Sequence, residues 1–368
     1  MKKQHLLSET STVNVNLTSV YHQLVKFPKP VIYILLFTCL LIPKPANAID
    51  ITDQIHNPLN HPIGKPLNLR PLRERADKLL LLGKQQYANG SIHQSIQSGL
   101  QALKIYHSLG DKNSQGLTYD LLAGAYLESG NIKYAEDAIR RRLGIARDNQ
   151  DFQTQIFALN NLGTLLIQKG EPDAAGKTIV DALVISRDVG NLAGQGLSMS
   201  NLSLVHIRLG NYQEAIQFGE AALNFRRQTN DVAGEMNTLN NLGKAYLFAN
   251  DYDNTISNYG RALRLARINL DLPNQLRAID GLVKAHSAVG RYERAFELLE
   301  QQLAIAKSTN NIREELKYLV TSGKLYEKME KYALAREFYQ RALPLAQKLE
   351  DVRQEAELIY ILGELENR

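Results

Sequence analysis

Residues Leu242–Thr255 read Leu-Gly-Lys-Ala-Tyr-Leu-Phe-Ala-Asn-Asp-Tyr-Asp-Asn-Thr, and this pattern returns every forty residues along most of the chain. The small residue at its second position recurs as Gly83, Ala123, Gly163, Ser203, Gly243, Val283, Gly323 and Gly363. A second series, near its middle, is Gly90, Gly130, Gly170, Gly210, Asn250, Gly290 and Glu330. A third series, at its end, is Ser95, Ala135, Ala175, Ala215, Thr255, Ala295 and Ala335. The register does not slip, so the chain is an array of equal units.

A fourth series fixes the secondary structure of each unit. It is Asp111, Asp151, Asn191, Asp231, Asp271, Asn311 and Asp351, the residue types preferred at helix N-caps. The Gly/Asn series lies between two helical patterns and predicts a left-handed residue that ends the first helix. Apolar residues recur between these points at helical spacing. Each unit is therefore predicted to be a helical hairpin that must stack on the next hairpin to bury its apolar face.

The frame Leu-Gly-x-x-Tyr-x-x-x-Gly-x-Tyr-x-x-Ala, clearest at Leu242–Tyr246 and Gly290–Ala295, resembles the tetratricopeptide repeat. Its forty-residue unit is similar to those of kinesin light chains and Pins-type adaptors. The resemblance implies an all-α, right-handed superhelical solenoid of antiparallel helical hairpins over residues 72–368. We expect seven full hairpins and an extra helix over residues 353–366. The sequence departs from the family pattern at Arg142 and Gln302, where alanine is preferred, and at Glu330, where glycine is preferred.

The first 48 residues differ from the rest of the chain. Val31 to Ile42 is a run of twelve uncharged residues, too short to span a bilayer, and Ala46-Asn47-Ala48 follows it. We therefore predict a signal peptide over 1–48 and an exported protein, periplasmic or secreted. An uncleaved membrane anchor is the alternative. Residues 49–71 are rich in proline and are predicted to be an extended linker.

The charge of the array argues against a nucleic-acid partner. The chain has a formal net charge of +5, but residues 49–368 carry 38 basic and 37 acidic side chains. A nearly neutral body lacks the excess of positive charge typical of nucleic-acid binding. Cys39, the only cysteine, lies in the predicted signal peptide, so no disulfide framework and no cysteine-ligated metal is expected.

No catalytic residues, cofactor site or metal site are predicted. Gly176-Lys177-Thr178 follows Gly170 with five intervening residues, where a phosphate-binding loop needs four, and it lies in a predicted helix. His206 and His286 occupy the repeat position of Tyr126, Tyr246 and Tyr326, which indicates packing. The chain is therefore not expected to be an enzyme.

Two sets of side chains are candidate ligands for a partner. In arrays that this chain resembles, the first helix of each hairpin lines a concave groove that binds peptides. The polar set is Asn160, Asn161, Asn201, Asn240 and Asn241, with Ser200, and resembles the Leu-Asn-Asn-Leu of kinesin light chains, where the asparagines hold a peptide backbone. The alternative is that these amides bond to neighbouring helices.

The basic set lies in the C-terminal half of the array. It consists of Lys244, Lys284 and Lys324 at one repeat position, with Arg277 and Lys317. Together they predict a positive strip suited to an acidic segment or a free carboxylate of a partner. A simply solvated helix face is the alternative.

The sequence therefore predicts an exported scaffold that binds a protein or peptide partner in its groove. Similar secreted arrays in bacteria, cyanobacteria especially, precede a caspase-like CHAT peptidase domain. The resemblance thus also allows a sensory half of a split peptidase system. A third alternative is a membrane-tethered assembly factor, which requires that the N-terminal segment stay uncleaved.

Overall fold

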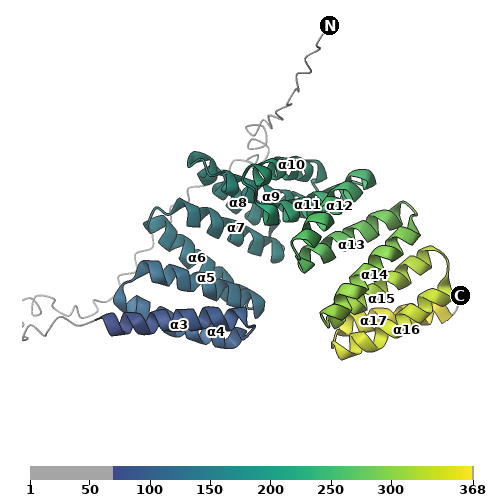
Figure 1. The fold of residues 1–368 in the computed structure, drawn as a ribbon, viewed down its shortest axis with the longest axis horizontal. Helices are drawn as coiled ribbons and strands as arrows, with labels where there is room; N and C mark the ends of the chain where they lie inside the picture. The colour runs from purple at the N-terminus through teal and green to yellow at the C-terminus, as the bar shows by residue number, and fades with distance from the viewer. Residues whose placement is uncertain (1–68, 367–368) are drawn as a thin grey trace, which may run out of the picture. The chain divides into compact units, whose positions relative to one another are not determined.

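The computed structural model describes residues 69–366 of this chain, all of them in helices or the turns between helices. The predicted signal peptide, and the predicted linker as far as residue 68, lie outside the described residues. Figure 1 shows the helices following one another in chain order. Labelled as there, they are α3 (Arg70–Ala88), α4 (Ile92–Leu109), α5 (Lys112–Glu128), α6 (Ile132–Asp148), α7 (Phe152–Gln168), α8 (Pro172–Asp188), α9 (Leu192–Leu209), α10 (Tyr212–Gln228), α11 (Val232–Phe248), α12 (Tyr252–Ile268), α13 (Leu272–Ala288), α14 (Tyr292–Ser308), α15 (Ile312–Lys328), α16 (Tyr332–Lys348) and α17 (Val352–Glu366).

The helices pair into hairpins as the repeat predicts. Odd-numbered helices open each hairpin and even-numbered helices close it, so that α3–α16 form seven hairpins and α17 begins an eighth. Each helix packs on the next in sequence, and opening helices such as α7, α9, α11 and α13 also contact one another. The described residues therefore form an all-α helical solenoid, confirming the predicted fold class.

The first helix begins slightly earlier than predicted. Pro71 was assigned to the linker, but α3 starts at Arg70, and Pro71 lies in its first turn. Proline is tolerated there because the N–H groups of the first turn have no partner within the helix.

All seven residues of the Asp/Asn series cap a helix. In each, the side chain accepts a hydrogen bond from the backbone N–H three residues later, for example Asp111 from Ser114 at 3.1 Å and Asp271 from Asn274 at 3.0 Å. The others are Asp151, Asn191, Asp231, Asn311 and Asp351. Sequence analysis identified the capping role because the same residue types recur at one repeat position.

The predicted turn residues all have positive φ, from 58° at Glu330 to 79° at Gly170 and Gly210. A second set, which sequence analysis missed, lies in the turns between hairpins: Gly110, Gln150, Gly190, Asn230, Leu270, Asn310 and Glu350. Only two of these seven are glycine, so composition gave little signal. The residue after each such position donates its N–H back to the preceding helix, as Asp231 does to the carbonyl of Arg226 at 2.9 Å. The turns between hairpins are therefore closed by the same backbone hydrogen bonds that end the preceding helix.

The two series of small residues bring paired helices into close contact. All seven members of the third series are fully buried. Ser203 donates from Oγ to the carbonyl of Ala215 at 2.7 Å, and Ser95 donates to that of Gly83 at 2.8 Å. A Cβ atom at Gly163 would lie 2.3 Å from Cγ1 of Ile179. Small side chains therefore allow the two helices of hairpins such as α7–α8 to cross closely.

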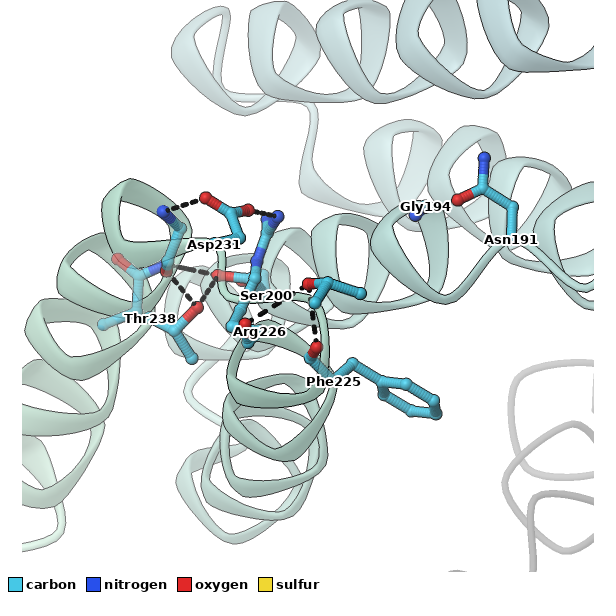
Figure 2. Close-up of polar contacts among 10 residues, drawn as sticks. Asn191, Gly194, Ser200, Phe225, Arg226, Asp231 and Thr238 are labelled. Atoms are coloured by element: carbon cyan, nitrogen blue, oxygen red, sulfur yellow. Dashed lines mark hydrogen bonds and ion pairs between the residues drawn. The ribbon is translucent and has the colours of Figure 1, made fainter.

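One buried ion pair interrupts this regularity. Arg226 is 8% exposed in its side chain and occupies a position that is alanine in four other hairpins. It pairs with Asp231, the cap of α11, while Ser200 of α9 faces Thr238 of α11 at 3.1 Å between oxygens (Figure 2). Gly196 and Gly234 make room, since a Cβ at Gly234 would lie 2.6 Å from Nε of Arg226. The arginine thereby links the end of α10 to the start of α11.

The described helices are all too short or too polar to cross a bilayer.

Candidate functional site

The opening helices of the hairpins line two clefts. The first, here called the basic cleft, has a volume of about 620 Å³ and lies along α11, α13 and α15. Its walls are Asn240, Lys244, Leu247, Phe248, Tyr259, Pro273, Leu276, Arg277, Asp280, Lys284, Glu314 and Lys317. The second, here called the apolar cleft, has a volume of about 520 Å³ and lies along α5, α6 and α7. Its walls include Leu127, Ile139, Phe157 and Leu165, with Asp120, Arg142 and Asn161.

Four of the five predicted basic residues meet in the basic cleft, where two of them pair with Asp280. Asp280 Oδ2 lies 2.7 Å from Nζ of Lys284, and Asp280 Oδ1 lies 3.2 Å from Nζ of Lys317. Lys244 and Arg277 complete the set. The other acidic residue on the wall, Glu314, accepts a hydrogen bond from Gln302 Nε2 at 2.8 Å. Four cations thus face two carboxylates, and the cleft is positively charged.

The pKa values reflect this charge. Burial acts to raise the pKa of Asp280, but Lys317 and Lys284 outweigh it and hold the pKa below its ordinary value. Burial lowers the pKa of Lys244, and repulsion from Arg208, Arg277 and Lys284 lowers it further. The ammonium group of Lys244 is therefore under-compensated and would be stabilised by an anion in the cleft.

The remaining predicted basic residue lies elsewhere. Lys324 is absent from the cleft wall and forms an ion pair with Glu357 of α17 at 3.0 Å. Arg277 has a second role besides its charge, because it donates to Asn237 Oδ1 and Asn241 Oδ1, both at 3.1 Å. It thus joins α13 to α11.

The asparagines mostly serve contacts between helices. Asn160 is buried and donates to Ser198 Oγ at 2.9 Å, while its Oδ1 accepts from Asn201 Nδ2 at 2.9 Å. Asn241 donates to the carbonyl of Ser200 at 3.4 Å. The alternative interpretation in the sequence analysis, bonding to neighbouring helices, therefore describes the contacts of these three residues.

Asn161 and Asn240 face the clefts. Asn161 is exposed on the wall of the apolar cleft. Asn240 is 1% exposed and donates to Asn274 Oδ1 at 2.8 Å, and its Oδ1 has no hydrogen-bond partner among the described residues.

Two departures from the family pattern contribute to the clefts, and sequence analysis did not assign them this role. Arg142 donates from Nε to Asp120 Oδ2 at 2.9 Å and from Nη2 to Thr154 Oγ1 at 3.0 Å, at the apolar cleft. Gln302, at the same repeat position, holds Glu314 on the wall of the basic cleft. Each side chain reaches the residue twelve positions later. A long polar residue at a position that otherwise carries alanine was the available signal.

The motifs rejected in the sequence analysis lie in packed helices. Gly176-Lys177-Thr178 is part of α8. His206 is 4% exposed and stacks on Phe218 with ring centroids 5.2 Å apart, and burial lowers its pKa. His286 is also buried, and the largest cause of its lowered pKa is again desolvation.

Comparison with known proteins agrees with this architecture. Two models of the tetratricopeptide repeat family match the chain, one over residues 154–228 and 234–308 and the other over residues 316–348. No curated protein matches the sequence.

Solved structures show the same fold at low sequence identity. The apo form of RapI has a TM-score of 0.59 and 14% identity, covering 75% of this chain and 99% of that chain. A Rap protein complexed with Competence and Sporulation Factor has a TM-score of 0.56 and 15% identity, covering 75% and 76%. A tetratricopeptide repeat protein from Parabacteroides merdae ATCC 43184 has a TM-score of 0.54 and 14% identity, covering 79% and 99%. With its stacked hairpins, its capped turns and these family matches, the chain is a tetratricopeptide repeat protein.

Proposed function

We propose that this protein is an interaction scaffold that holds an acidic segment of a partner protein in the basic cleft. The observation that carries the proposal is the excess of positive charge in the cleft, where Lys244, Arg277, Lys284 and Lys317 share the wall with only Asp280 and Glu314 as acidic residues. An acidic partner segment would supply the missing negative charge, chiefly to Lys244 and Arg277, because Asp280 already pairs with Lys284 and Lys317.

The walls of the cleft support a peptide as the occupant. Phe248, Leu247 and Leu276 offer apolar surface beside the charges, and Lys244 Nζ lies 5.9 Å from the centroid of the Phe248 ring. A Rap protein of this fold was solved in complex with Competence and Sporulation Factor, which supports a binding role for such arrays. No catalytic step is part of the proposal.

The test is a binding titration with a labelled oligo-glutamate peptide. The full chain is expected to bind it, and Lys244→Ala, Lys284→Ala and Lys317→Ala together are expected to weaken binding about tenfold or more at low salt. The difference should shrink as salt rises, because exposed charges are screened.

The matched control is Lys324→Ala. Lys324 occupies the same repeat position as Lys244 and Lys284 but lies outside the cleft and pairs with Glu357. Its removal should leave the affinity within about twofold, given the small contribution of exposed pairs. Equal losses in the triple variant and the control would mean that the basic cleft is not the binding site.

The proposal also places the scaffold outside the cytoplasm. The support is the sequence of residues 1–48, with its short apolar run and Ala46-Asn47-Ala48. N-terminal sequencing of the protein from culture fractions tests this part: a chain beginning at Ile49 supports export, and an intact Met1 in the membrane fraction supports the tethered form.

A further inference from the structure

The last residue of α12 and the turn that follows it carry the two most exposed large apolar side chains among the described residues. Ile268 is 77% exposed and Leu270 is 82% exposed. We call Ile268–Leu270 the apolar tip. None of its residues lines either cleft. Side chains of this size normally stabilise a fold by leaving water, and these two contribute nothing of that kind.

The backbone of the apolar tip is also unfavourable for its sequence. Leu270 has a φ of 56°. The described residues include fourteen with positive φ, and the other thirteen are glycine, asparagine, glutamine or glutamate. Positive φ is sterically unfavourable for leucine, whereas glycine adopts it freely. A residue that is both strained and exposed points to a role outside the fold.

Three arginines precede the apolar tip on α12. Arg261, Arg264 and Ile268 are spaced three and four residues apart and so lie on one side of α12. Arg264 is exposed and has no ion pair within the described part of the chain. Arg267 donates to the amide oxygen of Gln301, which leaves its charge uncompensated.

Few carboxylates offset these arginines. Glu235 lies 3.8 Å from Arg261 but is shared with Arg227 at 2.9 Å. Asp271 is next to the tip, and its two oxygens accept from the backbone N–H and the side-chain amide of Asn274. The tip therefore combines apolar side chains with an excess of positive charge.

We propose that the apolar tip inserts into the surface of an anionic lipid bilayer, with Arg264 and Arg267 against the lipid phosphates. At a bilayer interface, lipid phosphates attract cationic side chains, and apolar side chains insert just below these phosphates. Ile268 ends α12 and Leu270 lies in the turn after it, both largely exposed, and the arginines lie earlier on the same helix, which matches that order. The surface is separate from the basic cleft, so a bound partner segment and a bilayer would occupy different residues.

A probe within the tip tests insertion directly. The full chain carries Cys39→Ser, to remove the native thiol, and Asn269→Cys labelled with an environment-sensitive fluorophore. Vesicles of equimolar phosphatidylglycerol and phosphatidylcholine are expected to shift its emission to the blue and to protect it from an aqueous quencher about threefold or more. Phosphatidylcholine vesicles alone and high salt should abolish both effects, because the attraction is electrostatic.

Two variants with matched controls separate insertion from damage to the fold. Leu270→Gly should lose the protection while its thermal midpoint rises, since glycine relieves the backbone at this position. Tyr360→Gln changes a side chain that is 69% exposed on α17 and should change neither. Arg264→Gln should reduce protection on anionic vesicles, whereas Arg353→Gln, at the start of α17, should not.

Two results would overturn the proposal. One is an equal rate of quenching of the label at residue 269 with and without anionic vesicles. This result would count against insertion of the tip even if another part of the chain bound the vesicles. The other is sedimentation that reports a dimer lost in Leu270→Gly, which would assign the tip to a second copy of this chain.

Discussion

At the scale of single residues, the junction of α10 and α11 depends on Asp231. Its carboxylate accepts from the backbone N–H of Gly234 at 2.8 Å and also pairs with the buried Arg226. Burial lowers the pKa of Arg226 and pairing with Asp231 offsets part of this, so the aspartate helps to keep the arginine charged. Asp271 caps α13 in the same way without a buried cation to neutralise.

Asp231→Ala is therefore expected to destabilise the protein more than Asp271→Ala. Loss of the cap alone should cost about 1 kcal/mol, whereas an unpaired buried arginine should raise the loss to about 3–5 kcal/mol. Urea denaturation measures both. Arg226→Ala introduces the alanine found at this position in four other hairpins. Added to Asp231→Ala it should recover part of the lost unfolding free energy, and added to Asp271→Ala it should recover none. Equal losses from the two single variants would show that the pair contributes nothing beyond the cap.

The asparagines give a second prediction at this scale. Asn241 is buried and bonds to Ser200 and Arg277, so Asn241→Ala should cost about 1–3 kcal/mol of unfolding free energy. Asn161 is exposed, and Asn161→Ala should stay within about 0.5 kcal/mol. The measurement is again denaturant unfolding. A larger loss at Asn161 than at Asn241 would contradict the contacts described above.

At the scale of helices and hairpins, His206 and His286 occupy a packing position that carries tyrosine in other hairpins. Both rings are buried with Nδ1 lacking a hydrogen-bond partner in the described structure, and burial lowers both pKa values. The unfolded chain therefore binds a proton at a higher pH than the folded chain does. Stability must fall as the pH drops below the ordinary histidine pKa of about 6.5, until the folded protein is protonated too.

His206→Phe is expected to flatten this pH dependence. Each buried histidine contributes up to about 1.4 kcal/mol per pH unit below pH ~6.5, so removing one should lower the slope of stability against pH. Thermal or urea unfolding between neutral pH and about pH 5 measures the slope. His93→Phe, at an exposed position on α4, is the control and should leave it unchanged. An identical slope in His206→Phe and the native chain would mean that the buried ring does not couple to stability.

Sequence predicted the elements well because each signal is repeated. Seven N-caps and seven turn positions occupy the same place in the forty-residue unit, so occasional departures such as Glu330 did not obscure them. The candidate site was less predictable, because its contacts join residues about one repeat apart. Asn160 bonds to Ser198 and Asn201, and Arg277 bonds to Asn237. In each case several polar residues about one repeat away could have been the partner, and the sequence does not distinguish among them. Asp280, which organises the lysines, occurs at a repeat position that carries several residue types and gave no signal on its own.

At the scale of the whole molecule, the described array divides its binding surface by chemistry. The opening helices of the N-terminal half line an apolar cleft, and those of the C-terminal half line a positively charged one. Some side chains on the cleft walls, such as Arg277 and Asn240, also join neighbouring hairpins, whereas Lys244 makes no ion pair among the described residues. The account's central claim is that a partner places an acidic segment in the basic cleft.

Photo-crosslinking from the cleft wall tests that claim most directly. Phe248 lies on the wall and is replaced by photoreactive benzoylphenylalanine in the full chain, in the cells that produce it. The account predicts an adduct whose crosslinked partner peptide is rich in aspartate and glutamate. The adduct should disappear with Lys244→Ala, Lys284→Ala and Lys317→Ala and persist with Lys324→Ala. An adduct that survives the triple substitution, or that maps to a partner segment without acidic residues, would contradict it.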